Sequence, residues 1–550
     1  MPGALPTDTE ARVLPGPAEL LADAARATPD RLALVESGGR SLTWAALDDE
    51  VGRVATGLSA AGIVAGYRVA VMTANRIEFV TAYLGTLRAQ AVAVPLNPGG
   101  SARETARVFA DCGVRLVVAD PDSIVTVREA VAMLGLPLDE SPLRDDVRAE
   151  TLARATAPRV VAVGTTLLPG ERSYDHLRAG ASRVTLPLHD SERLAALLYT
   201  SGTSGLPRGA MLSHRALAAN IEQAAAVDPP IMHGDDVVLG VLPLFHVYGL
   251  NAVLGGVLRR RAKLVLTERF DPQETLDLID DEAISVVPVA PAVFAHWRDL
   301  DLADRLGPVR LVLSGSAPIA AEVIEQFVER TGIPVHQGYG LTEAAPVVTT
   351  TLRSDGAPAG SVGAPLPGVE VRVVGESGAP LADGDDPGEL EVRGENLFSG
   401  YWPDGADGPG PDGWWRTGDV GYVDPRGDVY LVDRVRDLVI VSGFNVYPAE
   451  VERVVAAVPG VAAAGVVGVP DDLTGEAVVA YVVPDPAVVP PADPATLADD
   501  VRAACEQQLA RFKVPSRLEV VPELPHSVTG KVQRGRLRGL ERRRALGLLE

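Results

Sequence analysis

Cysteine is scarce in this sequence. Cys112 and Cys505 are the two cysteines among 550 residues, and they lie far apart, without the close spacing of zinc-binding cysteines. Their scarcity excludes a disulfide framework and a thiolate metal site. We interpret both as reduced thiols and expect a cytoplasmic protein.

A secretory leader is also lacking. The first residues, MPGALPTDTEARV, contain no basic patch followed by an apolar run, so no signal peptide is expected. One stretch, 237–258, has no Asp, Glu, Lys or Arg and is long enough to span a bilayer. Because it contains Pro243, His246, Asn251 and four glycines, we predict a buried strand, a loop and a packed helix, and no transmembrane segment.

Basic residues are outnumbered by acidic ones. The 50 Lys and Arg against 73 Asp and Glu give a formal net charge of −23. An acidic surface repels phosphate backbones, so nucleic acid is not expected as a partner. A chain of 550 residues is too long for one core, so two or more domains are expected.

What the chain does contain is a regular alternation of short β-branched runs and helical patterns. The runs at 68–72, 116–119, 285–289 and 310–313, with an amphipathic helix at 320–330, indicate an α/β fold with parallel-type sheets covered by helices. From about Gly388, shorter strands and Gly/Pro turns indicate an antiparallel, β-rich subdomain. A large N-terminal domain is predicted over 1–433.

The remaining residues have a different pattern. A helix beginning near 448–449, strands near 463–470 and 477–484, a proline-rich loop, another helix and a charged tail are expected. This pattern predicts a small α+β domain over 434–550.

Glycine and hydroxyl residues gather in one segment, LYTSGTSGLPRG at 198–209. Glycines allow close backbone approach, and N–H groups and hydroxyls can cradle phosphate oxygens. Composition alone also fits a flexible surface loop. No Gly-Lys-Ser/Thr ends the segment, which disfavours a P-loop NTPase. The expected ATP contacts are Thr200, Ser201, Gly202, Thr203, Ser204, Gly205 and Arg208.

This loop resembles the signature Tyr-Thr-Ser-Gly-Thr-Thr-Gly-x-Pro-Lys-Gly of the adenylate-forming superfamily, which includes acyl-CoA synthetases, adenylation domains and luciferases. Ser204 and Arg208 stand where Thr and Lys are commoner, and both keep the hydroxyl and the positive charge. Further motifs follow in family order over roughly residues 20–538. They are most similar to those of fatty-acid–CoA and 4-coumarate–CoA ligases.

The resemblance implies the nucleotide contacts. In QGYGLTE at 337–343, Thr342 would contact the α-phosphate and Glu343 would hold Mg²⁺, a hard cation that prefers carboxylates. In WRTGD at 415–419, Asp419 would bind the ribose, and Arg434 both ribose and phosphate. The other implied ATP contacts are Ser316, Ala317, Gln337, Gly338, Tyr339 and Gly340.

The resemblance also implies a mobile C-terminal domain that turns about Arg436. Its segment Ser442-Gly443-Phe444 would border the CoA pantetheine. Lys531, after Thr-Gly, would bridge the substrate carboxylate and the α-phosphate, stabilising transition-state charge. Considered singly, Arg434 and Arg436 also fit a charged turn between strands, and Lys531 also fits a solvated surface lysine.

The segment PLFHVYG at 243–249 bears on the acid. Amino-acid-activating relatives place an Asp here to bind the ammonium group, and this chain has none, so an amino acid is not expected. His246 resembles the aromatic gate of the acyl pocket, a satisfied core histidine being the alternative. The predicted pocket residues, mostly small or apolar, favour a medium- or long-chain fatty acid or an aryl acid: His246, Tyr248, Asn251, Ala290, Gly315, Gly338, Pro346 and Val347.

Together these features predict an ATP-dependent carboxylate–CoA ligase that uses ATP, Mg²⁺ and coenzyme A, with Lys531, Glu343, Thr342 and His246 at the reacting centre. Two alternatives stay open: an adenylating enzyme that loads a carrier protein, and a non-catalytic nucleotide-binding homologue. The sequence also leaves a homodimer open.

Overall fold

The β-branched runs of the N-terminal third form a seven-stranded sheet whose neighbours pair in parallel, except for the final hairpin β8–β9. Strands such as β3 are buried because helices cover the sheet, as their continuous apolar runs predict. The order is β7 (Arg172–Ser173), β6 (Arg159–Ala162), β5 (Val114–Ala119), β3 (Arg68–Met72), β4 (Val92–Pro95), β8 (Leu194–Ser201) and β9 (Pro207–Ser213). Residues 202–206 of the expected phosphate loop, which follow β8 and precede β9 in the sequence, lie outside the described residues.

The computed structural model describes residues 14–545 except 138–139, 145–146, 183–189, 202–206, 303, 317–318, 320, 357, 376–377, 382–383, 385–387, 435–438, 447, 486–492, 526–531 and 533. The helices of the first half are α1 (Pro17–Ala27), α2 (Trp44–Ala60), α3 (Ile77–Arg88), α4 (Ala102–Cys112), α5 (Ile124–Leu134), α6 (Ala149–Arg154), α7 (Tyr174–Leu177) and α8 (His214–Ala225).

A second sheet of 13 strands combines two kinds of pairing. Its run from β14 to β1 is parallel, whereas the pairs from β14 to β17 are antiparallel. The order is β17 (Val369–Val374), β18 (Gly388–Gly394), β19 (Trp415–Val423), β20 (Val429–Arg434), β16 (Ser361–Pro365), β15 (Val347–Thr350), β14 (Val335–Gly340), β13 (Leu311–Ser314), β12 (Val286–Val289), β10 (Val237–Gly240), β11 (Lys263–Leu266), β1 (Leu32–Glu36) and β2 (Ser41–Thr43).

The antiparallel part therefore begins earlier than predicted, at β15 and not near Gly388. The sequence of a short strand does not show whether the strand pairs in parallel or antiparallel, because that depends on its partner strands. The helices associated with this sheet are η1 (Tyr248–Leu254), α9 (Gly255–Arg260), α10 (Pro272–Asp281), α11 (Ala292–Trp297), α12 (Ala321–Thr331), η2 (Thr342–Ala344) and η3 (Thr351–Arg353).

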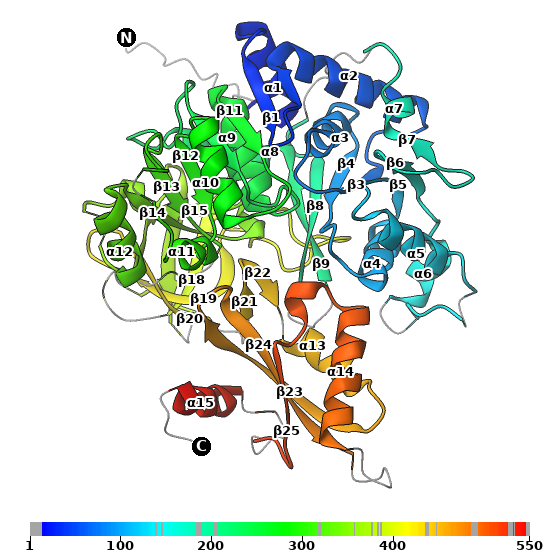
Figure 1. Ribbon diagram of the computed structural model, residues 1–550, viewed down its shortest axis with the longest axis vertical. Helices are drawn as coiled ribbons and strands as arrows, with labels where there is room; N and C mark the ends of the chain where they lie inside the picture. Colours follow the sequence, from blue (N-terminus) through cyan, green and yellow to red (C-terminus); the bar gives the residue numbers. More distant parts are fainter. Residues whose placement is uncertain are drawn as a thin grey trace, which may run out of the picture.

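The C-terminal part has its own five-stranded sheet and lies below the larger part in Figure 1. Its strands are β22 (Phe444–Val446), β21 (Val439–Val441), β24 (Gly475–Pro484), β23 (Val461–Asp471) and, on β24, β25 (Arg517–Val520). Its helices are α13 (Pro448–Ala456), α14 (Pro494–Gln508), η4 (Arg511–Lys513) and α15 (Arg534–Ala545).

The expected charged tail is in fact helix α15. Leu537 is buried with Tyr481 and Leu524, and Glu541 accepts hydrogen bonds from Tyr481 and Arg517. One apolar anchor and these polar contacts dock a segment that looked like a solvated run of arginines.

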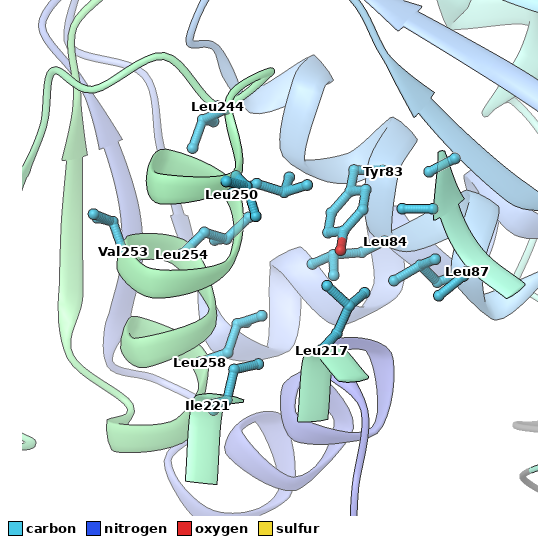
Figure 2. Close-up of a cluster of buried hydrophobic side chains, with 14 of the residues drawn as sticks. Tyr83, Leu84, Leu87, Leu217, Ile221, Leu244, Leu250, Val253, Leu254 and Leu258 are labelled. Carbon is cyan, nitrogen blue, oxygen red and sulfur yellow. The ribbon is translucent and has the colours of Figure 1, made fainter. Parts of the chain in front are cut away.

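The segment 237–258 forms β10, a loop and then the continuous helix η1–α9, as predicted, although its first part is a π-helix. Figure 2 shows Leu250, Leu254 and Leu258 on the side of this helix that faces Leu217 of α8 and Tyr83 of α3. Within the described residues, no helix has both the length and the apolar content to cross a bilayer.

Leu254→Ala should lower the free energy of unfolding of the N-terminal part by about 2–5 kcal/mol, because Leu254 is fully buried in this cluster and its removal leaves a cavity. All five tryptophans precede residue 434, so their fluorescence during urea unfolding reports on this part. Leu168→Ala, at a side chain that is 49% exposed, is the matched control, and equal losses in both variants would contradict the assignment.

Candidate active site

A cavity of about 150 Å³ runs between α8 and the helix η1–α9 and on to the end of β14. Tyr248, Ala252, Gly256 and Arg260 recur every four residues along its wall, so they share one face of the helix. The small side chains of this face leave room for a ligand, while the opposite face carries the leucines of the core. All the predicted acyl-pocket residues except Ala290 line this cavity: His246, Tyr248, Asn251, Gly315, Gly338, Pro346 and Val347.

Two aromatic side chains, His246 and Tyr248, line this first cavity. A Cβ added at Gly315 would lie 2.9 Å from Cε1 of Tyr248, so the tyrosine ring rests directly on the backbone there. The backbone N–H of Tyr248 donates to Nδ1 of His246 at 3.4 Å. Burial lowers the pKa of His246 to about 4, so the imidazole at this position is neutral at pH 7.

Asn251 lines the first cavity and also links three segments of the chain by hydrogen bonds. Its side-chain amide donates to the carbonyls of Leu217 at 3.1 Å and Ala345 at 2.7 Å. These bonds hold η1 against α8 and against the segment that precedes β15.

A second cavity reaches from the border of the two domains to the same place. It shares His246, Val247 and Thr342 with the first cavity, and Thr200 also lines it. An apolar pocket, the start of the phosphate loop and a passage from the domain border therefore meet at these residues.

The small domain presents Gly443 and Phe444 to this junction. Gly443 has a φ of +81°, and a Cβ there would lie 2.8 Å from Cβ of Ser316, so only glycine allows this approach. The ring of Phe444 stacks on Phe245 with centroids 5.8 Å apart and meets His246 edge-on at 6.0 Å. Ser442 precedes them, with its backbone N–H bonded to the carbonyl of Thr474.

The glycine-rich end of β14 forms another part of the first cavity, through Gln337, Gly338, Tyr339, Gly340 and Thr342. The hydroxyl of Tyr339 donates to Oδ2 of the buried Asp419 at 2.6 Å. Asp419 pairs in register with Arg434 across β19 and β20. The predicted adenine and ribose motifs are thus in direct contact.

Tyr401 is a site residue that the sequence did not reveal. Its hydroxyl donates to Oε1 of Glu343 at 2.5 Å, and the guanidinium of Arg208 lies 3.8 Å from its ring centroid. Arg208 also binds Oδ2 of Asp407 at 2.7 Å. One tyrosine therefore links the predicted metal-binding carboxylate to the predicted phosphate-binding cation. A lone tyrosine in a turn carries no pattern that would have identified it.

Several predicted residues lie outside the described part of the chain: Gly202, Thr203, Ser204, Gly205, Ala317, Arg436 and Lys531. Ser201 and Arg434 are described as strand backbone only.

The His246 imidazole should stay neutral from pH 8 down to about pH 5, because burial disfavours its charged form. Side-chain NMR of ¹³C-labelled histidine tests this among eight histidines, with His246→Gln identifying the resonance. A midpoint near the ordinary value of about 6.5 would contradict it.

Comparison with known proteins finds similarity over most of the chain. The family model for AMP-binding enzymes matches residues 21–402, and the model for the AMP-binding enzyme C-terminal domain matches residues 450–531. The long-chain-fatty-acid–CoA ligase of Bacillus subtilis is 32% identical over 94% of this chain and 93% of its own length. A feruloyl-CoA synthase of an Amycolatopsis species is 34% identical over 94% and 96%.

Solved structures are similar over most of the chain as well. The amide bond synthetase McbA of Marinactinospora thermotolerans superposes with a TM-score of 0.80 at 30% identity, over 96% of this chain and 99% of its own. With matches of this extent to both parts of the chain, the protein belongs to the AMP-binding enzyme family.

Proposed function

We propose that this protein is an ATP-dependent carboxylate–CoA ligase, which activates an organic acid as its acyl-adenylate and transfers the acyl group to coenzyme A. The observation that carries the proposal is the meeting of the two cavities at His246, Val247 and Thr342. One cavity suits the acid, the other suits a thiol that arrives from the domain border, and the nucleotide motifs lie beside both.

In the first step the acid's carboxylate attacks the α-phosphorus of ATP and pyrophosphate leaves. We propose that Thr342 and Thr200, which both line the second cavity, contact the α-phosphate. The guanidinium of Arg208 lies over the ring of Tyr401, and the hydroxyl of Tyr401 donates to Glu343. Lys531 is proposed to stabilise the negative charge that develops as one anion attacks another. Holding the two reactants in line supplies much of the acceleration.

We propose Mg²⁺ as the metal, held by Glu343 and the phosphates. In the described part of the chain, no group of three or more His, Cys, Asp or Glu could form a metal cage. One carboxylate and substrate phosphates are the ligands that Mg²⁺ usually takes at such sites, so Glu343 fits. The ion would neutralise charge on the leaving pyrophosphate.

In the second step the thiol of CoA attacks the acyl carbonyl and AMP leaves. The backbone at Gly443 and the ring of Phe444 flank the approach, because they border the junction from the small domain. We place the hinge at Arg436 and the domains at 1–433 and 434–550. In support, β20 ends in the large sheet at Arg434, and β21 begins in the small one at Val439.

We propose a fatty acid or an aryl acid as the substrate. The first cavity follows the helix η1–α9 from Tyr248 to Arg260, past Ile221, Ala224 and Met232. A cavity of about 150 Å³ is comparable to one known to bind benzene. The ligases similar to this chain are named for long-chain fatty acids and for feruloyl-CoA.

The function is tested with acids of increasing length, aryl acids and amino acids, following pyrophosphate and acyl-CoA separately. Acyl-CoA formation with a hydrophobic acid is the expected result. Pyrophosphate without acyl-CoA would move the acceptor to a carrier protein, or to an amine as the name of McbA suggests. Failure of every acid, with no ATP binding by calorimetry, would overturn the proposal.

Tyr401→Phe should slow adenylate formation about 10-fold to 100-fold and raise the Mg²⁺ concentration for half-maximal rate. The lost hydrogen bond to a charged carboxylate is worth about 1.5–3 kcal/mol. Tyr422→Phe, on a ring stacked against Tyr430, is the matched control. Pyrophosphate release at varied Mg²⁺ measures both, and equal rates in the two variants would contradict the role of Tyr401.

A further inference from the structure

A buried lysine connects the two domains. Lys513 of η4 lies in the small domain, and its Nζ is 2.9 Å from Oε1 of Glu104 on α4 and 2.8 Å from Oε1 of Glu450 on α13. Lys513 is 8% exposed and Glu450 2%. One contact therefore crosses the domain border, while the other stays within the small domain.

The Glu104 carboxylate is held in place by contacts within its own, N-terminal domain. Glu104 belongs to the capping box that starts α4, in which its Oε2 accepts from the backbone N–H of Ser101 at 3.2 Å. Its Oε1 is thereby directed to Lys513. The adjoining contacts, from Ser101 and Arg103 to Gln508 at 2.9 and 2.8 Å, align α4 with the end of α14.

Charge balance makes this bridge specific to one domain orientation. The buried Lys513 lies between the half-buried Glu104 and the buried Glu450, and moving it away from Glu104 breaks an ion pair across the border, which is costly. Burial acts to lower the pKa of Lys513, but Glu104 and Glu450 together outweigh it and raise that pKa above its ordinary value, so Lys513 stays charged. Arg107 is the other cation that acts on both carboxylates. A second described ion pair across the border, Arg298–Asp472, is exposed and 3.7 Å long.

The bridge adjoins the elements that carry the thiol passage. Phe512, next to Lys513, stacks on Phe444 with centroids 4.6 Å apart. Phe444 in turn stacks on Phe245 of the large domain, and Gly443 lies against Ser316. The orientation fixed by Lys513 and Glu104 is therefore the one that brings Gly443 to the junction of the cavities.

We propose that Lys513 is a positioning residue for acyl transfer to CoA, because its bridge to Glu104 holds the small domain with Gly443 against the site. The inference rests on the proposed function. The bridge should therefore affect only one of the two half-reactions. Acyl transfer needs the orientation that the bridge holds, whereas adenylate formation, which is proposed to depend on Lys531, does not.

The test measures the two half-reactions separately in single-turnover experiments on the full chain. Lys513→Met should slow the transfer from preformed acyl-adenylate to CoA by about tenfold or more, since small misplacements have effects of this size. Adenylate formation should change by less than about twofold, because only interactions made in the transition state of a step change its rate, and the bridge is proposed to act in the other step. Lys513→Arg should restore much of the transfer rate. Arg511→Met, at an exposed cation of the same turn, is the matched control for loss of charge.

Glu104→Gln separates a bridge from a role within the small domain. Glutamine keeps the capping box but loses the charge, and it lies in the other domain, so folding of the small domain is untouched. The expected result is the same selective loss as in Lys513→Met, with no further loss in the double variant. Equal slowing of both half-reactions, or an unchanged transfer rate in Glu104→Gln, would overturn the inference. Wild-type protein without acyl-CoA product would instead refute the proposed function.

Discussion

Between β14 and β15 the pairing in the large sheet changes from parallel to antiparallel, and residues 341–346 make the turn. The turn is tight: a Cβ added at Gly340 would lie 2.3 Å from the carbonyl oxygen of Pro346. This constraint places Thr342 at the junction of the two cavities and Glu343 beside Tyr401. The two cavities meet at Thr342 because the sheet reverses at this point, and the proposed function depends on this meeting.

Features that depend on local pattern were predictable from the sequence. The run RVAVM gave β3 at its predicted bounds, and 237–258 gave a strand, a loop and a helix. The glycine-rich motif at 337–340 was identified by its resemblance to the adenylate-forming superfamily, and the structure shows that Gly338 and Gly340 lie where the backbone approaches other backbone closely. The α/β class followed from the alternation of periodicities.

Features that depend on distant partners were not predictable in this way. Tyr401 belongs to the site because it contacts Glu343 and Arg208. Lys513 forms the bridge because it contacts Glu104, which lies more than 400 positions earlier in the sequence. The antiparallel direction of β15 and the docking of α15 likewise follow from tertiary contacts, which override weak local preferences. A π-helix at 248–254 depends on how the chain packs between α8 and the sheet.

The two cavities draw on different parts of the chain. Apart from Gly443, the first is lined by residues between 220 and 350, whereas the second takes Phe444, Ala510, Phe512 and Lys513 from the small domain. Under the proposed function, substitutions along α8 and the helix η1–α9 would alter which acid is accepted while leaving the lining of the second cavity intact. If the two cavities serve acid and acceptor as proposed, selection can act on the two preferences independently, because among the described residues the cavities share three, His246, Val247 and Thr342.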